Sequence, residues 1–135
     1  MKIIVDTSIW SLALRRHTPP INPESEALRK FIEQGEDIFL LGIILQEILQ
    51  GVKEQAAFKR LNEHFEAFPM LEITREIYVK AAELKNHLSK NGIQVSTVDA
   101  LIAAAAISNG YYLFTNDKDF SYIAKHSKLK LLKIH

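Results

Sequence analysis

Short apolar segments rich in β-branched residues alternate along this chain with longer segments that carry apolar residues at helical spacing. The apolar runs Lys2–Val5, 38–41 and 111–115 are short enough to be strands buried on both faces. A last strand is predicted at 129–132, and a further short one at 70–73. Buried strands separated by helices are typical of a parallel sheet that helices cover on both sides. We therefore predict an α/β protein, a three-layer α/β/α fold with a central, mainly parallel sheet.

Helix start and stop signals divide the rest of the chain. Asn22 followed by Pro23 predicts a helix start, and Gly35 predicts the end of the same helix. Further helices are predicted at residues 7–14, 43–50, 54–65, 74–90 and 97–109, and a short turn or helix is predicted at 117–124. Because the sequence contains neither an internal repeat nor a linker, we expect one domain that spans residues 1–135.

Composition and charge exclude several classes of function. The formal net charge is only +1, so a nucleic acid would have to be bound by a local group of cations. The absence of cysteine excludes disulfides and thiolate metal ligands, and it suits a reducing compartment. Asp6 interrupts the first apolar run, and no run reaches the ~20 apolar residues of a membrane span. We expect a cytoplasmic protein that does not bind membranes.

Four acidic residues are expected to meet at the carboxyl edge of the predicted sheet. Asp6 and Asp117 each follow a predicted strand, and the carboxyl ends of parallel strands lie at the edge where ligands bind. Asp99 reaches the same edge because it lies in the first turn of a helix that runs antiparallel to the next strand. Glu47 lies about one turn into the helix that follows residues 38–41.

A divalent cation would explain this convergence of carboxylates. Without one they would repel each other, and some would have to stay protonated. Carboxylate oxygens in a chain without cysteine suit Mg²⁺ or Mn²⁺. Such a site also explains why Asp99 begins a helix that is otherwise apolar. Each acid has a local alternative: Ser96 and Asp99 match a capping box, Asp6 and Asp117 fit helix caps, and an acid like Glu47 is often merely solvated.

Four motifs, IIVDTSIW, LQEILQG, STVDALIAAAA and LFTNDKDF, follow one another across nearly the whole chain. Together they resemble PIN-domain nucleases, most closely the VapC-type toxins of toxin–antitoxin pairs. The resemblance implies a PIN fold and an endoribonuclease that depends on Mg²⁺ or Mn²⁺. It also implies a homodimer and a cognate VapB-type antitoxin that covers the site through hydrophobic contacts and a basic side chain.

The resemblance also assigns roles to particular residues. The acids implied as catalytic and metal-binding are Asp6, Glu47, Asp99 and Asp117, and Asp119 is an alternative to Asp117. Supporting roles are implied for Ser8, Thr115 and Asn116. We expect Asp6 and Asp99 to be the principal metal ligands, and we name Arg15, Arg16 and Lys118 as candidate contacts to RNA phosphates.

Two other functions remain open at this point. A non-catalytic domain of the same fold, binding RNA or protein, would keep the acids only for structure. A phosphate-accepting receiver domain would place paired acids at the first strand, whereas this chain has Asp6 alone there. A phosphatase of the D-x-D type is excluded because Thr7 and Ser8 follow Asp6.

Overall fold

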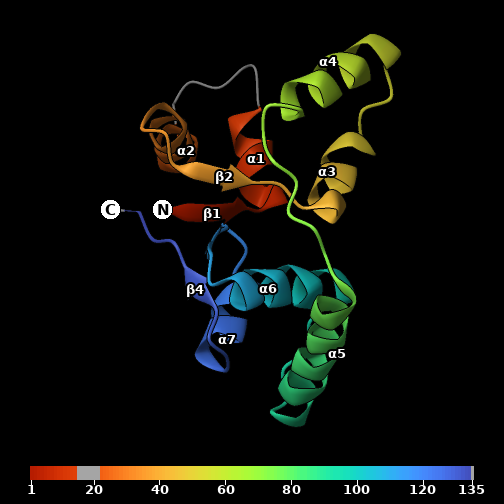
Figure 1. Cartoon of the computed structure of the whole chain (residues 1–135), viewed down its shortest axis with the longest axis vertical. Coiled ribbons are helices and arrows are strands. Elements are labelled where there is room, and N and C mark those ends of the chain that lie inside the picture. The colour runs from red at the N-terminus through yellow and green to blue at the C-terminus, as the bar shows by residue number, and fades with distance from the viewer. Residues whose placement is uncertain (15–21, 135) are drawn as a thin grey trace.

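The computed structural model describes residues 1–14 and 22–134, and its strands and helices alternate as expected (Figure 1). Arg15 and Arg16 lie outside the described residues. The elements follow the order β1 (Lys2–Val5), α1 (Thr7–Ala13), α2 (Pro23–Glu33), β2 (Asp37–Phe39), α3 (Gly42–Leu49), α4 (Gln55–Phe65), α5 (Arg75–Lys90), α6 (Thr97–Asn109), β3 (Tyr112–Phe114), α7 (Asp119–Lys125) and β4 (Lys130–Leu131).

The strands form a parallel sheet in the order β2-β1-β3-β4, which confirms the predicted sheet. Ile3 of β1 pairs with Ile38 of β2 on one side and with Tyr112 of β3 on the other. Val5 and Phe114, the last residues of β1 and β3, are also partners. The chain segments that leave these two strands therefore start side by side at one edge of the sheet.

The predicted strand at 70–73 is wrong, since this segment forms only an isolated parallel bridge between Leu40 and Met70. Leu40 donates its amide to the carbonyl of Pro69, and Leu71 donates to the carbonyl of Leu40. Proline has no amide hydrogen, so Pro69 cannot donate a further hydrogen bond to a ladder in this direction. The segment touches the sheet once and then continues to α5.

The helices lie on both faces of the sheet. In Figure 1, α1 to α4 fill the upper half of the molecule and α5 to α7 fill the lower half. The chain moves from β1 to β2 in one direction across the sheet, and from β3 to β4 in the opposite direction. Because such crossovers are right-handed, the connecting helices α1 and α2 cover one face, and α7 covers the other.

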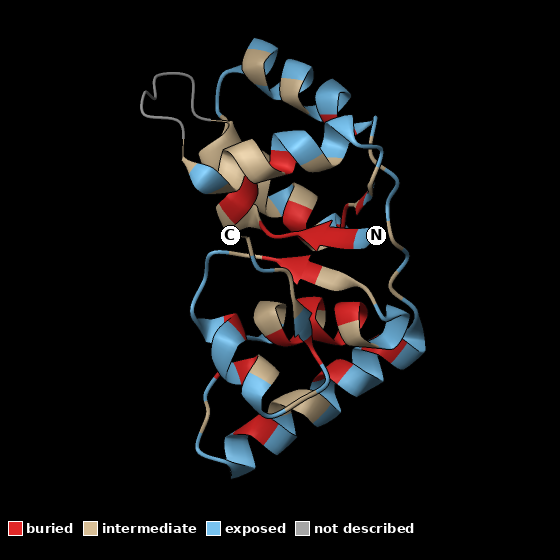
Figure 2. Ribbon diagram, turned by 90° about the vertical axis from the view of Figure 1, so that its left-hand side faces the viewer, coloured by how far each residue is buried: buried red, intermediate tan, exposed pale blue. Residues whose placement is uncertain are grey.

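One cluster of buried side chains joins the sheet to its helices (Figure 2). The buried residues of α6 are Ala100, Ile102, Ala103, Ala104, Ala105 and Ala106. Alanine side chains let this helix approach the strands closely, which fixes the position of its first turn. The helix ends at Gly110, whose φ of 68° lies in the left-handed region that glycine adopts without strain.

Trp10 connects α1 to the end of α4. Its indole is 2% exposed, and the rings of Phe65 and Phe68 meet it edge-on at centroid distances of 4.9 and 5.2 Å. Aromatic pairs in this arrangement add to the stabilisation that burial provides. Trp10 is therefore part of the core. In the described part of the chain, no helix is both long and apolar enough to cross a membrane.

Candidate active site

Asp6 lies at the carboxyl end of β1, directly beside the end of β3. Its amide donates a hydrogen bond of 2.9 Å to the carbonyl of Phe114, so the residues that follow the two strands are neighbours. Asp6 is 6% exposed, and among the described residues it is the one buried residue with a charged side chain. A buried carboxylate is costly unless hydrogen bonds or a cation compensate its charge.

Two hydroxyl groups donate hydrogen bonds to the same oxygen of Asp6. Ser8 Oγ lies 2.9 Å from Asp6 Oδ2, and Thr115 Oγ1 lies 2.8 Å from it. The hydroxyls are held in turn by the backbone, since the amide of Asn116 donates to Ser8 Oγ and the amide of Asp117 donates to Thr115 Oγ1. Among the described residues no hydrogen bond to Oδ1 is found. This oxygen is therefore available to an added ligand.

Three further carboxylates form a cluster. One oxygen from each of Asp99, Asp117 and Asp119 lies within 4.8 Å of the other two. Asp99 is placed by the start of α6, where its amide donates to Ser96 Oγ at 3.0 Å. Asp117 and Asp119 are held together because the Asp119 amide donates to Asp117 Oδ1 at 2.9 Å. The helix cap that Ser96 provides and the acidic cluster therefore coexist.

Asp6 lies near this cluster, because Thr115 Oγ1 donates to Asp6 and accepts from the amide of Asp117. Partial burial, as the largest cause, and the negative charges of Asp117, Asp6 and Asp119 together raise the pKa of Asp99 to about 6. A hydrogen bond with Ser96 acts in the opposite direction. Desolvation and like charges both disfavour the ionised form of a carboxyl group. A bound cation would remove the repulsion and return Asp99 to its charged form.

Glu47 lies in α3 and joins the site through Thr7. Thr7 Oγ1 donates a hydrogen bond of 2.9 Å to Glu47 Oε1, and Thr7 is the neighbour of Asp6 in the chain. Glu47 is partly buried, and it is not one of the three carboxylates that lie within 4.8 Å of one another. It therefore lies on the α3 side of the site, where Thr7 of α1 holds it.

The sequence pattern alone assigns no firm role to two residues of this site. Thr7 was not singled out, although a hydroxyl residue directly after Asp6 is the signal that could have found it. The sequence leaves Asp119 open as a turn former, an outer member of the cluster or an alternative to Asp117, and the structure brings both Asp117 and Asp119 into the cluster. The Asp119 amide bonds the Asp117 side chain, and this two-residue turn brings both carboxylates near Asp99.

The donor set fits a hard divalent cation. The groups that converge are carboxylates and hydroxyls, which suit Mg²⁺ and Mn²⁺, and the chain has no cysteine to favour a softer metal. Asp6 Oδ1 and the carboxylates of Asp99, Asp117 and Asp119 are the oxygens that would hold it. Asn116 and Lys118 are exposed beside this cluster.

Comparison with known proteins agrees with this geometry. The family model described as "PIN domain" matches residues 3–126, which is most of the chain. The chain belongs to the PIN-domain family.

Within this family the chain is similar to proteins named Ribonuclease VapC1. It is 30% identical to the one from Rickettsia felis over 134 residues, which covers 91% of each chain. It is 27% identical to the one from Methanocaldococcus jannaschii over 130 residues, which covers 96% of this chain and 86% of the relative. This PIN domain therefore matches VapC proteins over nearly their full length.

Solved structures of VapBC complexes share the fold. A chain of VapBC2 from Rickettsia felis, bound to a DNA fragment from the promoter of the pair, gives a TM-score of 0.79 at 20% identity, and the match covers 98% of both chains. A chain of VapBC-1 from nontypeable Haemophilus influenzae gives 0.78 at 19% identity, covering 98% of this chain and 97% of that one. At these identities the likeness establishes the fold.

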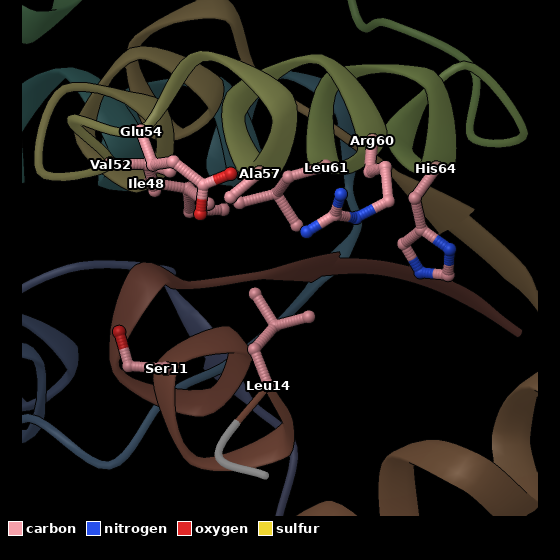
Figure 3. Close-up of a pocket in the computed structure, with 9 residues that line it drawn as sticks. All are labelled: Ser11, Leu14, Ile48, Val52, Glu54, Ala57, Arg60, Leu61 and His64. Carbon is pink, nitrogen blue, oxygen red and sulfur yellow. The ribbon is translucent and has the colours of Figure 1, made fainter.

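A groove of about 620 Å³ lies between α1, α3 and α4 of this PIN domain. In Figure 3 the side chains of α4 point into the groove, across from Ser11 and Leu14. Thr7, Ser11 and Leu14 follow at spacings of four and three residues, so they lie on one side of α1. The groove therefore lies along the side of α1 that also carries Thr7. Its lining residues are Ser11, Leu14, Ile48, Val52, Glu54, Ala57, Arg60, Leu61 and His64.

Proposed function

We propose that this PIN domain is a VapC-type toxin, an endoribonuclease that hydrolyses RNA with Mg²⁺ or Mn²⁺ and is neutralised by a cognate VapB-type antitoxin. The observation that carries the proposal is the convergence of Asp99, Asp117 and Asp119 within 4.8 Å beside the buried Asp6. The similarity to proteins named as ribonucleases supports RNA as the substrate. We also propose a homodimer, as the resemblance to VapC-type toxins implies, and a cytoplasmic location.

Each residue of the site has a proposed role that follows from its position. Asp6 and Asp99 are the proposed principal ligands of the cation, with Asp117 or Asp119 completing the set. The bound cation supplies charge neutralisation for the phosphate and a more acidic water. Ser8 and Thr115 hold one oxygen of Asp6, and the other oxygen would be left for the cation. Glu47, which accepts a hydrogen bond from Thr7, would orient the attacking water and accept its proton.

The reaction is a simple hydrolysis. Water forms a new bond to phosphorus, the bond between phosphorus and the 3′ oxygen breaks, and that oxygen takes up a proton. The products carry a 5′-phosphate and a 3′-hydroxyl. Repulsion between the carboxylates and the RNA phosphate would oppose this reaction unless a cation is bound, which explains the proposed dependence on a divalent metal.

The test is the Asp99→Asn variant, which keeps the shape of the side chain and removes one charge. We expect loss of at least about 100-fold in RNA cleavage rate, since a metal ligand is removed from the reacting centre. The assay compares wild type and variant with Mn²⁺, with Mg²⁺ and with EDTA. Asp37→Asn is the matched control, because Asp37 is exposed at the start of β2. Cleavage by Asp99→Asn at the wild-type rate, or by wild type in EDTA, would contradict the proposed metal-dependent ribonuclease function.

We infer that the antitoxin docks in the groove between α1, α3 and α4. Ser11 of the groove lies one turn after Thr7 on α1, so a chain bound there would be able to extend a basic side chain towards the acids. Leu14, Ile48 and Leu61 supply apolar contacts, while Glu54 and Arg60 supply charges of both signs. These contacts suit an amphipathic segment with complementary charges.

Ala57→Glu tests this docking site by placing a charge in the groove away from the acids. We expect it to abolish co-purification with the product of the gene immediately upstream and to leave RNA cleavage unchanged. Ala82→Glu, an exposed site on α5, is the control. If Ala57→Glu still binds that partner as tightly as wild type, the docking site lies elsewhere.

A further inference from the structure

We propose that the exposed face of α7 binds single-stranded RNA, with Tyr122 stacking on a base and with Lys118 and Lys125 contacting phosphates on either side of it. The proposal rests on the proposed nuclease function and extends it to the path that the substrate takes away from the acidic cluster.

The spacing of these residues places them on one side of the helix. Lys118 precedes α7 but has helical backbone angles, φ −61° and ψ −25°, and its carbonyl accepts from the amide of Ser121 at 2.9 Å. The helical repeat therefore extends back to Lys118. Tyr122 follows four residues later and Lys125 three residues after that, so all three share a face. All three are exposed.

The opposite face of α7 anchors the helix in the core. Phe120 and Ile123 are each 0% exposed, so the helix cannot rotate to bury Tyr122. The phenol ring of Tyr122 is 51% exposed although a large aromatic side chain gains stability from burial. The ammonium group of Lys125 lies 5.7 Å from the centroid of this ring. Tyr122 thus lies beside a cation and stays accessible to a partner.

This combination is the one that single-stranded nucleic acids require. A base stacks on an exposed aromatic ring, and nearby cations contact the phosphates on both sides of that base. Unpaired bases are free to stack in this way, whereas the bases of a duplex are already stacked on each other. The chemistry therefore favours a single strand over a double helix.

The position of α7 connects this face to the acidic cluster. The helix begins at Asp119, one of the clustered acids, and Lys118 follows Asp117 directly. From Lys118 to Lys125 the helix rises about 10 Å, close to three nucleotide steps of about 3.4 Å in a stacked strand. A strand cleaved at the cluster can therefore continue over α7 without a gap.

The charge distribution supports the same path. Residues 118–134 contain five lysines and a single acid, whereas the whole chain has a net charge of only +1. The attraction for a polyanion is therefore concentrated in the segment that contains α7. The acids of the cluster repel the phosphates of a substrate, and cations immediately beside them hold the strand in place.

The test uses two substrates of different length and one aromatic position. Wild type and Tyr122→Ala are compared with Mn²⁺ on labelled single-stranded RNA of about ten nucleotides in a random-sequence pool, and on bis(p-nitrophenyl) phosphate, which is too small to reach α7. We expect Tyr122→Ala to lower kcat/KM on RNA by about 5- to 100-fold, mainly by raising KM, because one stacked base is lost. We expect no change on the small diester, and Tyr122→Trp should restore RNA cleavage.

Two further variants make the test specific. Tyr78→Ala is the matched control, because Tyr78 on α5 is 56% exposed, and we expect it to leave RNA cleavage unchanged. Lys125→Ala should weaken RNA binding and reduce the slope of log affinity against log salt by about 0.7, the value for one phosphate contact to a single strand.

The outcomes separate this inference from the proposed function. If wild type cleaves neither substrate, the proposed nuclease function fails. If wild type cleaves RNA and Tyr122→Ala does so equally well, the nuclease stands and the role of α7 is overturned. Equal losses on both substrates would also overturn it, because they would indicate damage to the site itself. So would a Tyr122→Ala variant that binds RNA normally but no longer binds its antitoxin.

Discussion

Asp6 shows how single hydroxyl groups determine the geometry of the site. Ser8 and Thr115 donate to one carboxylate oxygen, and backbone amides fix both hydroxyls. Hydrogen bonds to a buried charge contribute more to stability than those between neutral groups, because the charge has lost its water. The orientation of Asp6 is therefore set before any ligand binds.

Thr115→Val tests the contribution of one of these hydroxyls. The substitution keeps the shape of the side chain but removes the bond of 2.8 Å to Asp6 and the acceptor for the Asp117 amide. We expect a loss of about 1–3 kcal/mol in the free energy of unfolding, measured with urea. Thr115→Ser keeps the hydroxyl and should retain most of the stability. Equal stability of the valine and serine variants would contradict this account of Asp6.

Asp99 makes the stability of the metal-free protein depend on pH. Because burial and neighbouring charges raise its pKa to about 6, the folded protein binds a proton at this site more tightly than the unfolded chain does. The stabilisation is therefore fully present below the unfolded pKa of about 4, and it is lost as the pH rises through about 6.

Asp99→Asn removes this dependence, since the amide is neutral at every pH. In EDTA the variant should be more stable than wild type at about pH 7.5 and nearly equal to it at about pH 4. The difference is on the order of 1 kcal/mol, because solvent screens this half-exposed group. Urea unfolding at both pH values measures it, and a difference that stays constant with pH would exclude Asp99 as the cause.

At the scale of the elements, α6 determines where Asp99 lies. Its alanines pack closely on the sheet, and Ser96 caps its first turn by accepting from the Asp99 amide. Ser96→Ala should cost about 1 kcal/mol in unfolding free energy, as the loss of a helix cap does. Thermal or urea unfolding measures the change, and Ser96→Thr, which keeps a cap, serves as the control. An alanine variant as stable as wild type would mean that packing alone fixes this turn.

The elements differ in how well their sequences predict them. Thr74 caps α5, and the helix ends at Lys90, as its cap and apolar stripe indicate. The segment at 70–73 has the composition of a strand, but it meets the sheet only at Met70. Local composition reports whether a segment can be a strand. Whether a neighbouring strand is free to pair with it depends on the tertiary arrangement.

At the scale of the whole molecule, a metal that binds only the folded chain should stabilise it. Increasing Mn²⁺ or Mg²⁺ should raise the midpoint of thermal unfolding, with a gain of about 2.7 kcal/mol at a hundredfold excess over the dissociation constant. Asp6→Asn should lose this response, while Asp37→Asn should keep it. If wild type and Asp6→Asn respond alike to the metal, the ions bind elsewhere on the protein.

The sequence by itself determined the alternation of strands and helices, the parallel sheet, and the placement of Asp6, Asp99 and Asp117 towards one edge. These follow from local periodicity and from the rule that parallel strands end on the same side. The tertiary structure alone decided that Thr7 holds Glu47, that Asp119 joins the cluster, and that Tyr122 stays exposed beside Lys125. Each of these contacts depends on where a side chain points relative to residues that are distant in sequence or lie across a turn. Hydrophobic periodicity carries no information about where an individual side chain points.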